Sequence, residues 1–559
     1  MPTSPPHAAL RPIHDVAAEL GIPADHVIPW GPGRAKVHLD ALGERPPSGR
    51  LILVSAITPT PAGEGKTTMA IALAMGMRAI GRRAVLALRE PSLGPVFGMK
   101  GGGTGGGAAT LEPAEDINLH FTGDLHAITS AHNLLSALVD NTLQFGRPAP
   151  LDHRRVTWPR AVDMNDRFLR HVVVGLGGPL DGLPRESGFQ ITASSEVMAV
   201  LCLARDLPDL QARLGRIVVG WTAQDEPVTA DAIGAAPAMT ALLRDALMPN
   251  LAQAADGSPA LVHGGPFANI AHGTNSMIAT RMALATGADV VTEGGFGFDL
   301  GGEKFLDIAC RSAGIWPRAV VLVATLRALK YHGGATLAAA SQPDPDALRA
   351  GLRQLERHLF SVGAYGLHPV VAVNEFPDDQ TDEIALLRAW CANRGVPMAP
   401  CAGFTEGAAG SVELAEVVGR VVDATDTAVP EPWHPYEADD PYAEKIAAVA
   451  RHVYGADGID VAPAAARDLA RITAAVGGGL PVCIAKTHLS LSDDPTRRGV
   501  PHGFTVSVRE ARLAAGAGFV VASTGSIVTM PGLPREPAAL HVRIEPDGRI
   551  RGLMAGDRG

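Results

Sequence analysis

The chain has 559 residues and a formal net charge of −10, with 46 % hydrophobic and 19 % charged residues. This length exceeds what one hydrophobic core usually supports, so we expect two to four domains in a globular protein. The negative balance gives no general electrostatic reason to bind nucleic acid or an anionic membrane surface, and we expect neither as a partner.

The cysteines and the apolar runs indicate a cellular compartment. The five cysteines are scattered and never spaced as C-x-x-C, which favours free thiols in a reducing environment. The N-terminal residues lack a basic segment followed by an apolar one, the pattern of a signal peptide. Apolar runs such as residues 319–326 fall far short of the roughly 20 residues that span a bilayer. We therefore expect a cytoplasmic protein.

The first strong structural signal lies between residues 51 and 80. Residues 13–20 before it have helical apolar spacing, and residues 51–57 form a short apolar run, typical of a strand buried on both faces of a parallel sheet. Residues 58–68 follow with two prolines and two glycines and lead into an Ala-, Met- and Leu-rich helix. Strand, loop and helix in this order are the context of a phosphate-binding loop.

The composition of this loop matches that chemistry. Glycines let backbone N–H groups approach phosphate oxygens, Lys66 adds a positive charge, and the Thr67 hydroxyl can bind a magnesium ion. The usual pattern begins with glycine where Thr60 stands, so a structural turn remains the alternative. The residues that we expect to bind a nucleotide are Thr60, Pro61, Ala62, Gly63, Glu64, Gly65, Lys66, Thr67 and Thr68.

Residues 82–89 predict a second strand, parallel to the first across a right-handed crossover. It ends at Arg89 and Glu90, and polar residues at the carboxyl end of a parallel strand face the ligand crevice. We expect both side chains to reach the phosphates held by the loop. The alternative is a structural ion pair of Arg89 with Glu90 or another acid.

A glycine-rich stretch at residues 100–107 suits a closing loop over a ligand. Residues 115–124 then predict a third strand ending at Asp124, followed by His126 and a helix from near Thr129. Asp124 either holds a metal-bound water, as the acid on a neighbouring strand does in phosphate-loop enzymes, or caps the helix.

Strand and turn signals continue to the C-terminus, and residues 319–326 and 369–374 predict further buried strands. The Gly-rich loop 294–298 carries Phe296, which is suited to covering an adenine, while Glu303 and Lys304 are expected to form an exposed pair. Polar or Pro-rich segments near residues 341–346 and 429–441 predict boundaries. We expect a nucleotide-binding and catalytic domain at 1–345, a second α/β domain at 346–430 and a C-terminal α/β domain at 431–559.

Taken together, several motifs resemble the formate–tetrahydrofolate ligase family, also called 10-formyltetrahydrofolate synthetase. They lie in the family's order and cover nearly the whole chain. They include TPTPAGEGKTT (58–68), REPSLGPVFGMKGG (89–102), EDINLHFTGD (115–124), FANIAHGTNS (267–276), VATLRALKYHGG (323–334) and AKTHLSLSDDP (485–495).

This resemblance implies a phosphate-loop NTPase-like parallel sheet in a large domain with two smaller α/β domains. It also implies that formate attacks the γ-phosphate of Mg-ATP and that tetrahydrofolate then takes the formyl group from formyl phosphate. Arg89 matches the arginine proposed to hold formyl phosphate, and His120 and His126 match two histidines of this region. Family members are homotetramers, often activated by monovalent cations such as potassium or ammonium.

The folate side departs from the family pattern. Phe376 and Pro377 match one side of the pterin stack, whereas Phe404 stands where the family has tryptophan, so that it is either a smaller stacking face or a core residue. Glu375 replaces a usual arginine beside this site. Two other functions remain open: a homologue with an altered formyl acceptor, and a regulatory phosphate-loop ATPase, although Pro61 occupies the place of the second lysine that such ATPases carry.

Overall fold

A mixed sheet of twelve strands is the centre of the computed structural model, which describes residues 10–41, 43, 45–99, 102–146, 149–525 and 527–553. The strand order runs β1-β2-β13-β14-β4-β15-β3-β16-β17-β18, with β6 beside β13 and β5 beside β6. Neighbours from β14 to β18 pair in parallel, whereas β1, β2, β13, β5 and β6 pair antiparallel. The strands are β1 (Val27–Pro29), β2 (Ala35–Val37), β3 (Arg50–Ala56), β4 (Ala84–Leu88), β5 (Gly105–Gly106), β6 (Ala109–Glu112), β13 (Asn250–Ala254), β14 (Pro259–Val262), β15 (Asp289–Glu293), β16 (Ala319–Ala324), β17 (Pro369–Asn374) and β18 (Met398–Cys401).

Both faces of this sheet are covered, as the apolar strands predict. On β3, Ile52 and Val54 point into the core shared with α2 and α15, while Leu51 and Leu53 point into the larger core on the other face. The expected strands at 51–57, 82–89, 319–326 and 369–374 are confirmed as β3, β4, β16 and β17, and the helix at 13–20 as α1. Helices around the sheet include α1 (Ile13–Glu19), α2 (Lys66–Ala79), α9 (Met277–Ala285), α11 (Leu326–His332), α12 (Pro345–Ala364), α13 (Thr381–Ala392), α14 (Gly403–Glu406) and α15 (Val412–Ala424).

Strand β15 lies between β3 and β4, although it follows them by about 200 residues in the sequence. The two strands that flank α2 are parallel, as predicted, but they are not adjacent. Glu293 pairs in register with Val54 of β3. The loops that follow β3, β4 and β15 therefore leave the sheet side by side at its carboxyl edge, where ligands of parallel sheets bind.

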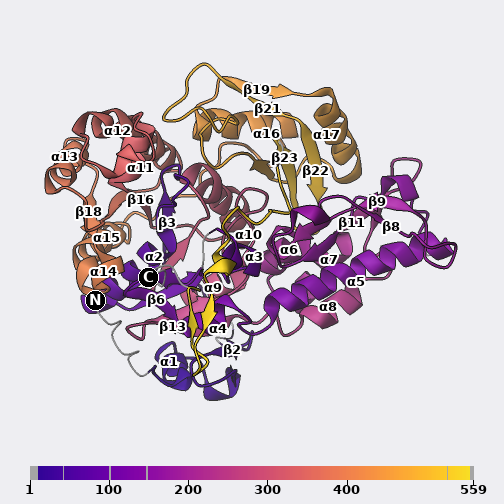
Figure 1. Cartoon of the computed structure of the whole chain (residues 1–559), viewed down its shortest axis with the longest axis horizontal. Coiled ribbons are helices and arrows are strands. Elements are labelled where there is room, and N and C mark those ends of the chain that lie inside the picture. The colour runs from indigo at the N-terminus through magenta and orange to yellow at the C-terminus, as the bar shows by residue number, and fades with distance from the viewer. Residues whose placement is uncertain are drawn as a thin grey trace.

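A helical arm and a C-terminal α/β part pack against this sheet (Figure 1). The arm extends to the right in the view and contains α5 (Asp124–Phe145), α6 (Glu196–Leu203), α7 (Leu207–Arg216), α8 (Ala236–Leu243) and the strands β7 (Arg160–Val162), β8 (Val172–Val174), β9 (Arg185–Ser187), β10 (Phe189–Ile191), β11 (Val218–Trp221) and β12 (Pro227–Thr229). The C-terminal part, orange to yellow at the top, contains α16 (Tyr442–Val449), α17 (Pro463–Val476), β19 (Gly458–Val461), β20 (Val482–Ala485), β21 (Thr505–Val508), β22 (Glu510–Ala514) and β23 (Phe519–Ser523).

Two expectations are wrong. Residues 115–124 do not form a strand: α4 spans Ala114–Asn118, and α5 begins at Asp124, five residues before the expected start. Acidic side chains in the first turn of α4 favour a helix N-terminus, although Ile117, Leu119 and Phe121 alternate with polar residues as in a strand. Glu303 and Lys304 are fully buried instead of exposed, and the Lys304 ammonium donates to the Ala268 carbonyl at 2.7 Å.

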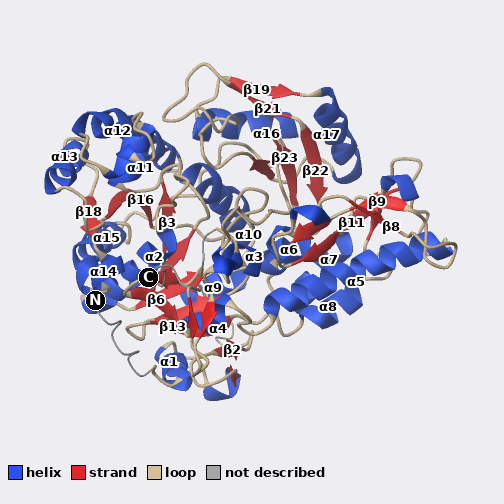
Figure 2. Ribbon diagram, viewed as in Figure 1, coloured by secondary structure: helices blue, strands red, loops and turns tan. Residues whose placement is uncertain are grey.

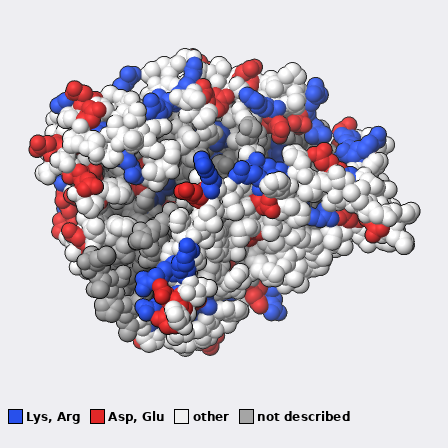
Figure 3. All heavy atoms as spheres, viewed as in Figure 1, with Lys and Arg blue, Asp and Glu red and all other residues white. Residues whose placement is uncertain are grey.

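The expectation of an α/β fold built on a mostly parallel sheet is confirmed (Figure 2). Strands β17 and β18, from the second predicted domain, continue the sheet of the first. The expected glycine-rich loop at 100–107 lies partly outside the described residues, and its last part holds β5. None of the helices in the described ranges is long and apolar enough to cross a membrane. The face in Figure 3 shows acidic and basic side chains interspersed.

Candidate active site

The predicted phosphate loop connects β3 to α2 at the carboxyl edge of the sheet. Gly63 and Gly65 have φ angles of 79° and 71°, a left-handed conformation that favours glycine. Lys66 is the first residue of α2, a helix of 14 residues, whose positive N-terminal end points at this loop. Pro61, Ala62, Gly63 and Gly65 are exposed, and Lys66, Thr67 and Thr68 are half-buried.

Glu64 fixes the shape of the loop from inside. Its carboxylate is buried, accepts a hydrogen bond from the Thr60 N–H at 2.8 Å and another from the Thr325 hydroxyl at 2.6 Å. Burial raises the pKa of Glu64, whereas these hydrogen bonds lower it. Thr60, which stands where the usual pattern has glycine, thus serves to hold Glu64, while Asn374 at the end of β17 donates to the Glu64 carbonyl at 3.1 Å. Contacts within the chain thus hold the loop in this shape.

Glu293, at the end of β15, joins the phosphate loop to Arg89. Its carboxylate accepts a hydrogen bond from the Thr67 hydroxyl at 2.9 Å and forms an ion pair with Arg89 at 3.1 Å. The Glu293 side chain is 4 % exposed and that of Arg89 is 23 % exposed. Arg89 thus forms an ion pair in which the acid is Glu293 and not Glu90, and its side chain remains partly exposed; its role at the phosphates stays a prediction.

Glu90, next to Arg89, is buried, and one of its carboxylate oxygens has no hydrogen-bond partner among the described residues. Burial and the nearby Asp124 charge raise the pKa of Glu90 well above its usual range, against the opposing effect of Lys36. In such a buried position the neutral form of the acid costs less than the charged form.

Asp124 and the two histidines lie near the start of α5. The Asp124 carboxylate is buried, pairs with the Lys36 ammonium at 2.8 Å and accepts from the Asn250 amide at 2.8 Å. His120 is exposed. His126 is also exposed, on the first turn of α5, with Ser130 Oγ at 3.4 Å from its Nε2. No contact among the described residues joins Asp124 to the phosphate loop.

The predicted folate-side aromatics follow two neighbouring strands. Asn374 of β17 pairs in register with Cys401 of β18, so that Phe376 and Phe404 leave the sheet from adjacent strand ends. Phe376 is half-buried, Pro377 is exposed, and Phe404, at the start of α14, is 39 % exposed. That exposure is more than a core residue has, and it leaves an aromatic face available for stacking.

Arg327, in the first turn of α11, connects the aromatic site to the phosphate loop. Its guanidinium lies 5.4 Å from the centre of the Phe376 ring and reaches the Gly63 carbonyl at 3.5 Å. The Nε atom of Arg327 is buried without a hydrogen-bond partner in the described residues. Arg327 and Asn374 thus hold the two predicted binding regions together at one edge of the sheet.

Comparison with known proteins gives a family for this arrangement. The sequence profile described as formate–tetrahydrofolate ligase matches residues 5–554. A formate–tetrahydrofolate ligase of Myxococcus xanthus (strain DK1622) is 62 % identical over 549 residues, which cover 98 % of this chain and 100 % of the relative. The chain belongs to the formate–tetrahydrofolate ligase family.

Further ligases of this family match with similar coverage. The formate–tetrahydrofolate ligase of Paracoccus denitrificans (strain Pd 1222) is 54 % identical over 545 residues, 97 % of this chain and 98 % of the relative. That of Hyphomonas neptunium (strain ATCC 15444) is 52 % identical over 550 residues, 98 % of each chain. The family resemblance of the sequence motifs is thus confirmed over nearly the full length.

In this member of the ligase family, acidic side chains surround Glu375 beside Phe376. Burial and then the charges of Asp379, Glu406 and Glu413 raise the pKa of Glu375. Glu406 lies on α14 with Phe404, so that the acidic side chains come from both strand ends that carry the aromatics. These acids disfavour anionic parts of a ligand beside Glu375, while Arg327 over the Phe376 ring and Arg388, which pairs with Glu413, supply positive charge nearby.

Phe296 of this ligase-family chain follows β15 in the Gly-rich loop. It has a φ angle of 58°, which is unusual for a bulky residue, and its ring stacks on that of His488 at 4.4 Å between centroids. His488 comes from the C-terminal part of the chain, where the Lys486 ammonium also pairs with Asp299 at 2.7 Å. The aromatic residue expected to cover an adenine therefore lies on the seam between the sheet and the C-terminal part.

Glu293 and Arg327 are the candidate residues that sequence reasoning missed. The available signal for Glu293 was its position: a charged residue directly after a buried strand and before Gly294-Gly295. Such a residue faces the crevice of a parallel sheet. No local signal showed that β15 inserts between β3 and β4, and that insertion is what places the carboxylate between Thr67 and Arg89.

Proposed function

We propose that this chain ligates formate to tetrahydrofolate with ATP, giving 10-formyltetrahydrofolate, ADP and phosphate through formyl phosphate. The observation that carries the proposal is the junction of the phosphate loop and Arg89 on one buried carboxylate, Glu293. It supports a γ-phosphate site at the loop after β3 with a guanidinium after β4, on the two sides of β15, as phosphoryl transfer to a small carboxylate requires. Near full-length similarity to enzymes called formate–tetrahydrofolate ligase supports it.

In the proposed first step, a formate oxygen attacks the γ-phosphorus and ADP leaves. The nucleotide contacts are assigned to the loop from Thr60 to Thr68, with Lys66 near the β- and γ-phosphates and Phe296 against the adenine. The Thr67 hydroxyl and the Glu293 carboxylate, 2.9 Å apart, are oxygen donors of the kind that Mg²⁺ prefers. Bound Mg²⁺ supplies positive charge to the phosphate oxygens. Asp124 is the weaker candidate because Lys36 and Asn250 occupy its oxygens.

Arg89 is assigned to the oxygens of formyl phosphate. A guanidinium can hold two such oxygens at once, and its ion pair with Glu293 fixes the side chain at the end of β4 before substrate arrives. His126 is assigned a proton-transfer role from the first turn of α5. Because an acyl phosphate hydrolyses in water, closure of the surrounding loops is part of the proposed mechanism.

In the second step, N10 of tetrahydrofolate attacks the formyl carbon, phosphate leaves, and N10 loses its proton. The pterin is assigned to the space between Phe376 with Pro377 and Phe404. An acceptor other than tetrahydrofolate is the second candidate function, because Glu375 adds negative charge where the family usually has arginine. The cytoplasmic location and the domain division at residues 345 and 430 stay predictions from the sequence. The homotetramer and activation by potassium or ammonium stay expectations from the family resemblance.

The test is a coupled assay with formate, Mg-ATP and tetrahydrofolate that follows ADP and the acid-generated methenyl product in parallel. Equal yields that depend on all three substrates would support the ligase. Lys66→Ala and Arg89→Ala should each abolish synthesis without a loss of folded structure by circular dichroism, whereas Arg349→Ala, at an exposed arginine, should not. Formate-dependent ADP without folate product would indicate a changed acceptor, and ADP formation without formate dependence would favour a regulatory ATPase.

A further inference from the structure

A cavity of about 520 Å³ lies where the helical arm meets the C-terminal part of the chain. It is lined by Arg213 and Arg216 of α7, by Arg311 of α10 (Arg311–Ala313), and by the turn between β22 and β23. Figure 1 shows α7, α10 and β22 in this region. None of the residues assigned above to nucleotide, formate or folate lines it. The volume is that of a site for a small organic ligand.

The charged residues that line this cavity are all basic. Three guanidiniums line it, and among the described lining residues there is no carboxylate. Arg213 pairs with Asp209 at 3.0 Å, and Arg311 donates to the Tyr436 carbonyl at 3.2 Å. Asp209 is itself shared, because Arg205 also contacts it. Asp231 acts on Arg216 and Asp307 on Arg311, so the acids near these guanidiniums lie outside the lining of the cavity.

Arg216 is the least satisfied of the three. It makes no hydrogen bond and no ion pair with any residue of the described ranges. Partial burial and the neighbouring Arg213 charge lower the pKa of the Arg216 guanidinium. Like charges held together in a partly buried cavity repel one another, and a bound anion relieves that repulsion.

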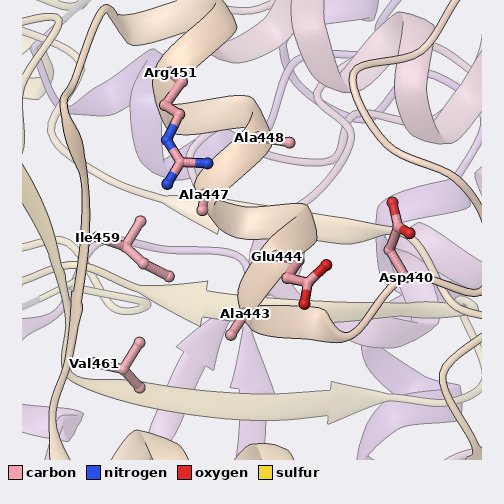
Figure 4. A pocket seen from close by; sticks show the side chains of 8 residues that line it. All are labelled: Asp440, Ala443, Glu444, Ala447, Ala448, Arg451, Ile459 and Val461. Atoms are coloured by element: carbon pink, nitrogen blue, oxygen red, sulfur yellow. The ribbon is translucent and has the colours of Figure 1, made fainter.

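A second hollow on the same part of the chain provides a contrast (Figure 4). It lies beside α16 and β19, and its charged lining residues are Arg451, Asp440 and Glu444. Figure 4 shows the Arg451 side chain and the two carboxylates around an apolar floor that includes Ile459. One cation against two acids gives that hollow no preference for anions. An all-basic charged lining therefore distinguishes the cavity lined by Arg213, Arg216 and Arg311, which we call the arginine cavity.

The remaining lining residues of the arginine cavity indicate which uncharged part of a ligand would fit there. Leu203, Ile308 and Leu480 supply apolar surface, and Gly479 and Gly518 leave backbone without side chains at the opening. Apolar walls with a few convergent charged groups are the usual composition of ligand sites. Guanidiniums bind planar carboxylates and phosphates through paired N–H donors.

We propose that this cavity binds a small organic anion that carries two negative charges on oxyanion groups and an apolar body, at a site separate from the phosphate loop. Phosphate esters and dicarboxylates share this chemistry. A purely structural role is the competing explanation, because Arg213 and Arg216 lie in the last turn of α7, where positive charge stabilises the helix end. The two explanations differ in whether a ligand binds.

Isothermal titration calorimetry on the full chain tests the proposal, with phenyl phosphate and phthalate as probes. The titrations use the Lys66→Ala variant in buffer without magnesium, so that binding of the probes at the phosphate loop is reduced. We expect one saturable site per chain, with Arg216→Gln and Arg311→Gln each weakening binding about tenfold. Arg216→Lys should lose less, because it keeps the charge. Arg205→Gln, which also contacts Asp209 but lies outside the lining, should not change the affinity.

The probe that binds more tightly identifies the ligand as a phosphate ester or a dicarboxylate. Thermal unfolding of each variant separates a loss of binding from a loss of fold, and Arg216→Lys serves where the glutamine variant unfolds. The absence of saturable binding for both probes, or equal affinity in the Arg216→Gln, Arg311→Gln double variant and the Arg205→Gln control, would overturn the proposal and leave the helix-end role.

Discussion

Replacing Glu293 by glutamine tests whether one carboxylate coordinates the two halves of the proposed first step. The carboxylate accepts from Thr67 at 2.9 Å and pairs with Arg89 at 3.1 Å, and its side chain is only 4 % exposed. Glutamine keeps the shape but offers one oxygen and no charge. One of the two donors then faces an N–H group, and Arg89 loses its counter-ion.

The size of the effect follows from these contacts. A hydrogen bond to a charged group stabilises by about 1.5 to 3 kcal/mol, roughly 1 kcal/mol more than a neutral one. Losing one such bond and weakening the other removes about 2 kcal/mol of positioning energy for Arg89 and Thr67. If this energy stabilises the transition state in the wild-type enzyme, its loss lowers kcat/KM for formate about 30-fold.

Steady-state formation of ADP against formate concentration, together with thermal unfolding, measures this prediction. Glu303→Gln is the matched control, because Glu303 is another fully buried acid and makes no hydrogen bond or ion pair with Thr67 or Arg89 in the described ranges. A Glu293→Gln enzyme within threefold of the wild-type kcat/KM would refute the role given to this carboxylate.

Three further predictions concern the loop and the aromatic site. Burial lowers the pKa of His358 to about 4, and its Nε2 accepts from the Thr58 N–H. Because His358 of the unfolded chain binds its proton near pH 6.5, urea unfolding should show about 2 kcal/mol less stability at pH 5 than at pH 7.5 from this group. The His358→Gln variant should lack this pH-dependent part of the stability. Gly65→Ala should reduce ATP turnover at least tenfold, because its Cβ would lie 2.6 Å from the Asn374 amide. Gly63→Ala, which is also at positive φ but in open space, should reduce turnover less. Equal losses of turnover in the two variants would contradict a role of the Asn374 contact. Phe404→Trp should lower the KM for tetrahydrofolate about two- to fivefold through added aromatic area, and an unchanged KM would place Phe404 outside the folate site.

The sequence predicted those parts of the structure that depend on local patterns. Buried strands such as residues 369–374 are apolar along their whole length, and the phosphate loop has a composition that few other structures require. Residues 115–124 were predicted wrongly as a strand because Ile117, Leu119 and Phe121 alternate with polar residues, while Pro113 and the acids that follow begin a helix instead.

Other features depend on which distant residues meet, and no local pattern contains that information. Glu303 and Lys304 were expected at the surface because charged neighbours usually lie there. Their burial depends on an environment in which the Ala268 carbonyl accepts from Lys304 and in which desolvation raises the pKa of Glu303. The place of β15 in the sheet, and with it the role of Glu293, was beyond local prediction for the same reason.

The strand order also affects how the chain is made. During synthesis β3 and β4 leave the ribosome early, but the strand that pairs with both, β15, follows about 200 residues later. At about 5 to 20 residues per second, the gap between them stays open for roughly 10 to 40 seconds. Throughout that time the nascent chain exposes two unpaired apolar strand edges, which invite aggregation. We therefore expect a protective chaperone to act on the nascent chain until Glu293 has emerged.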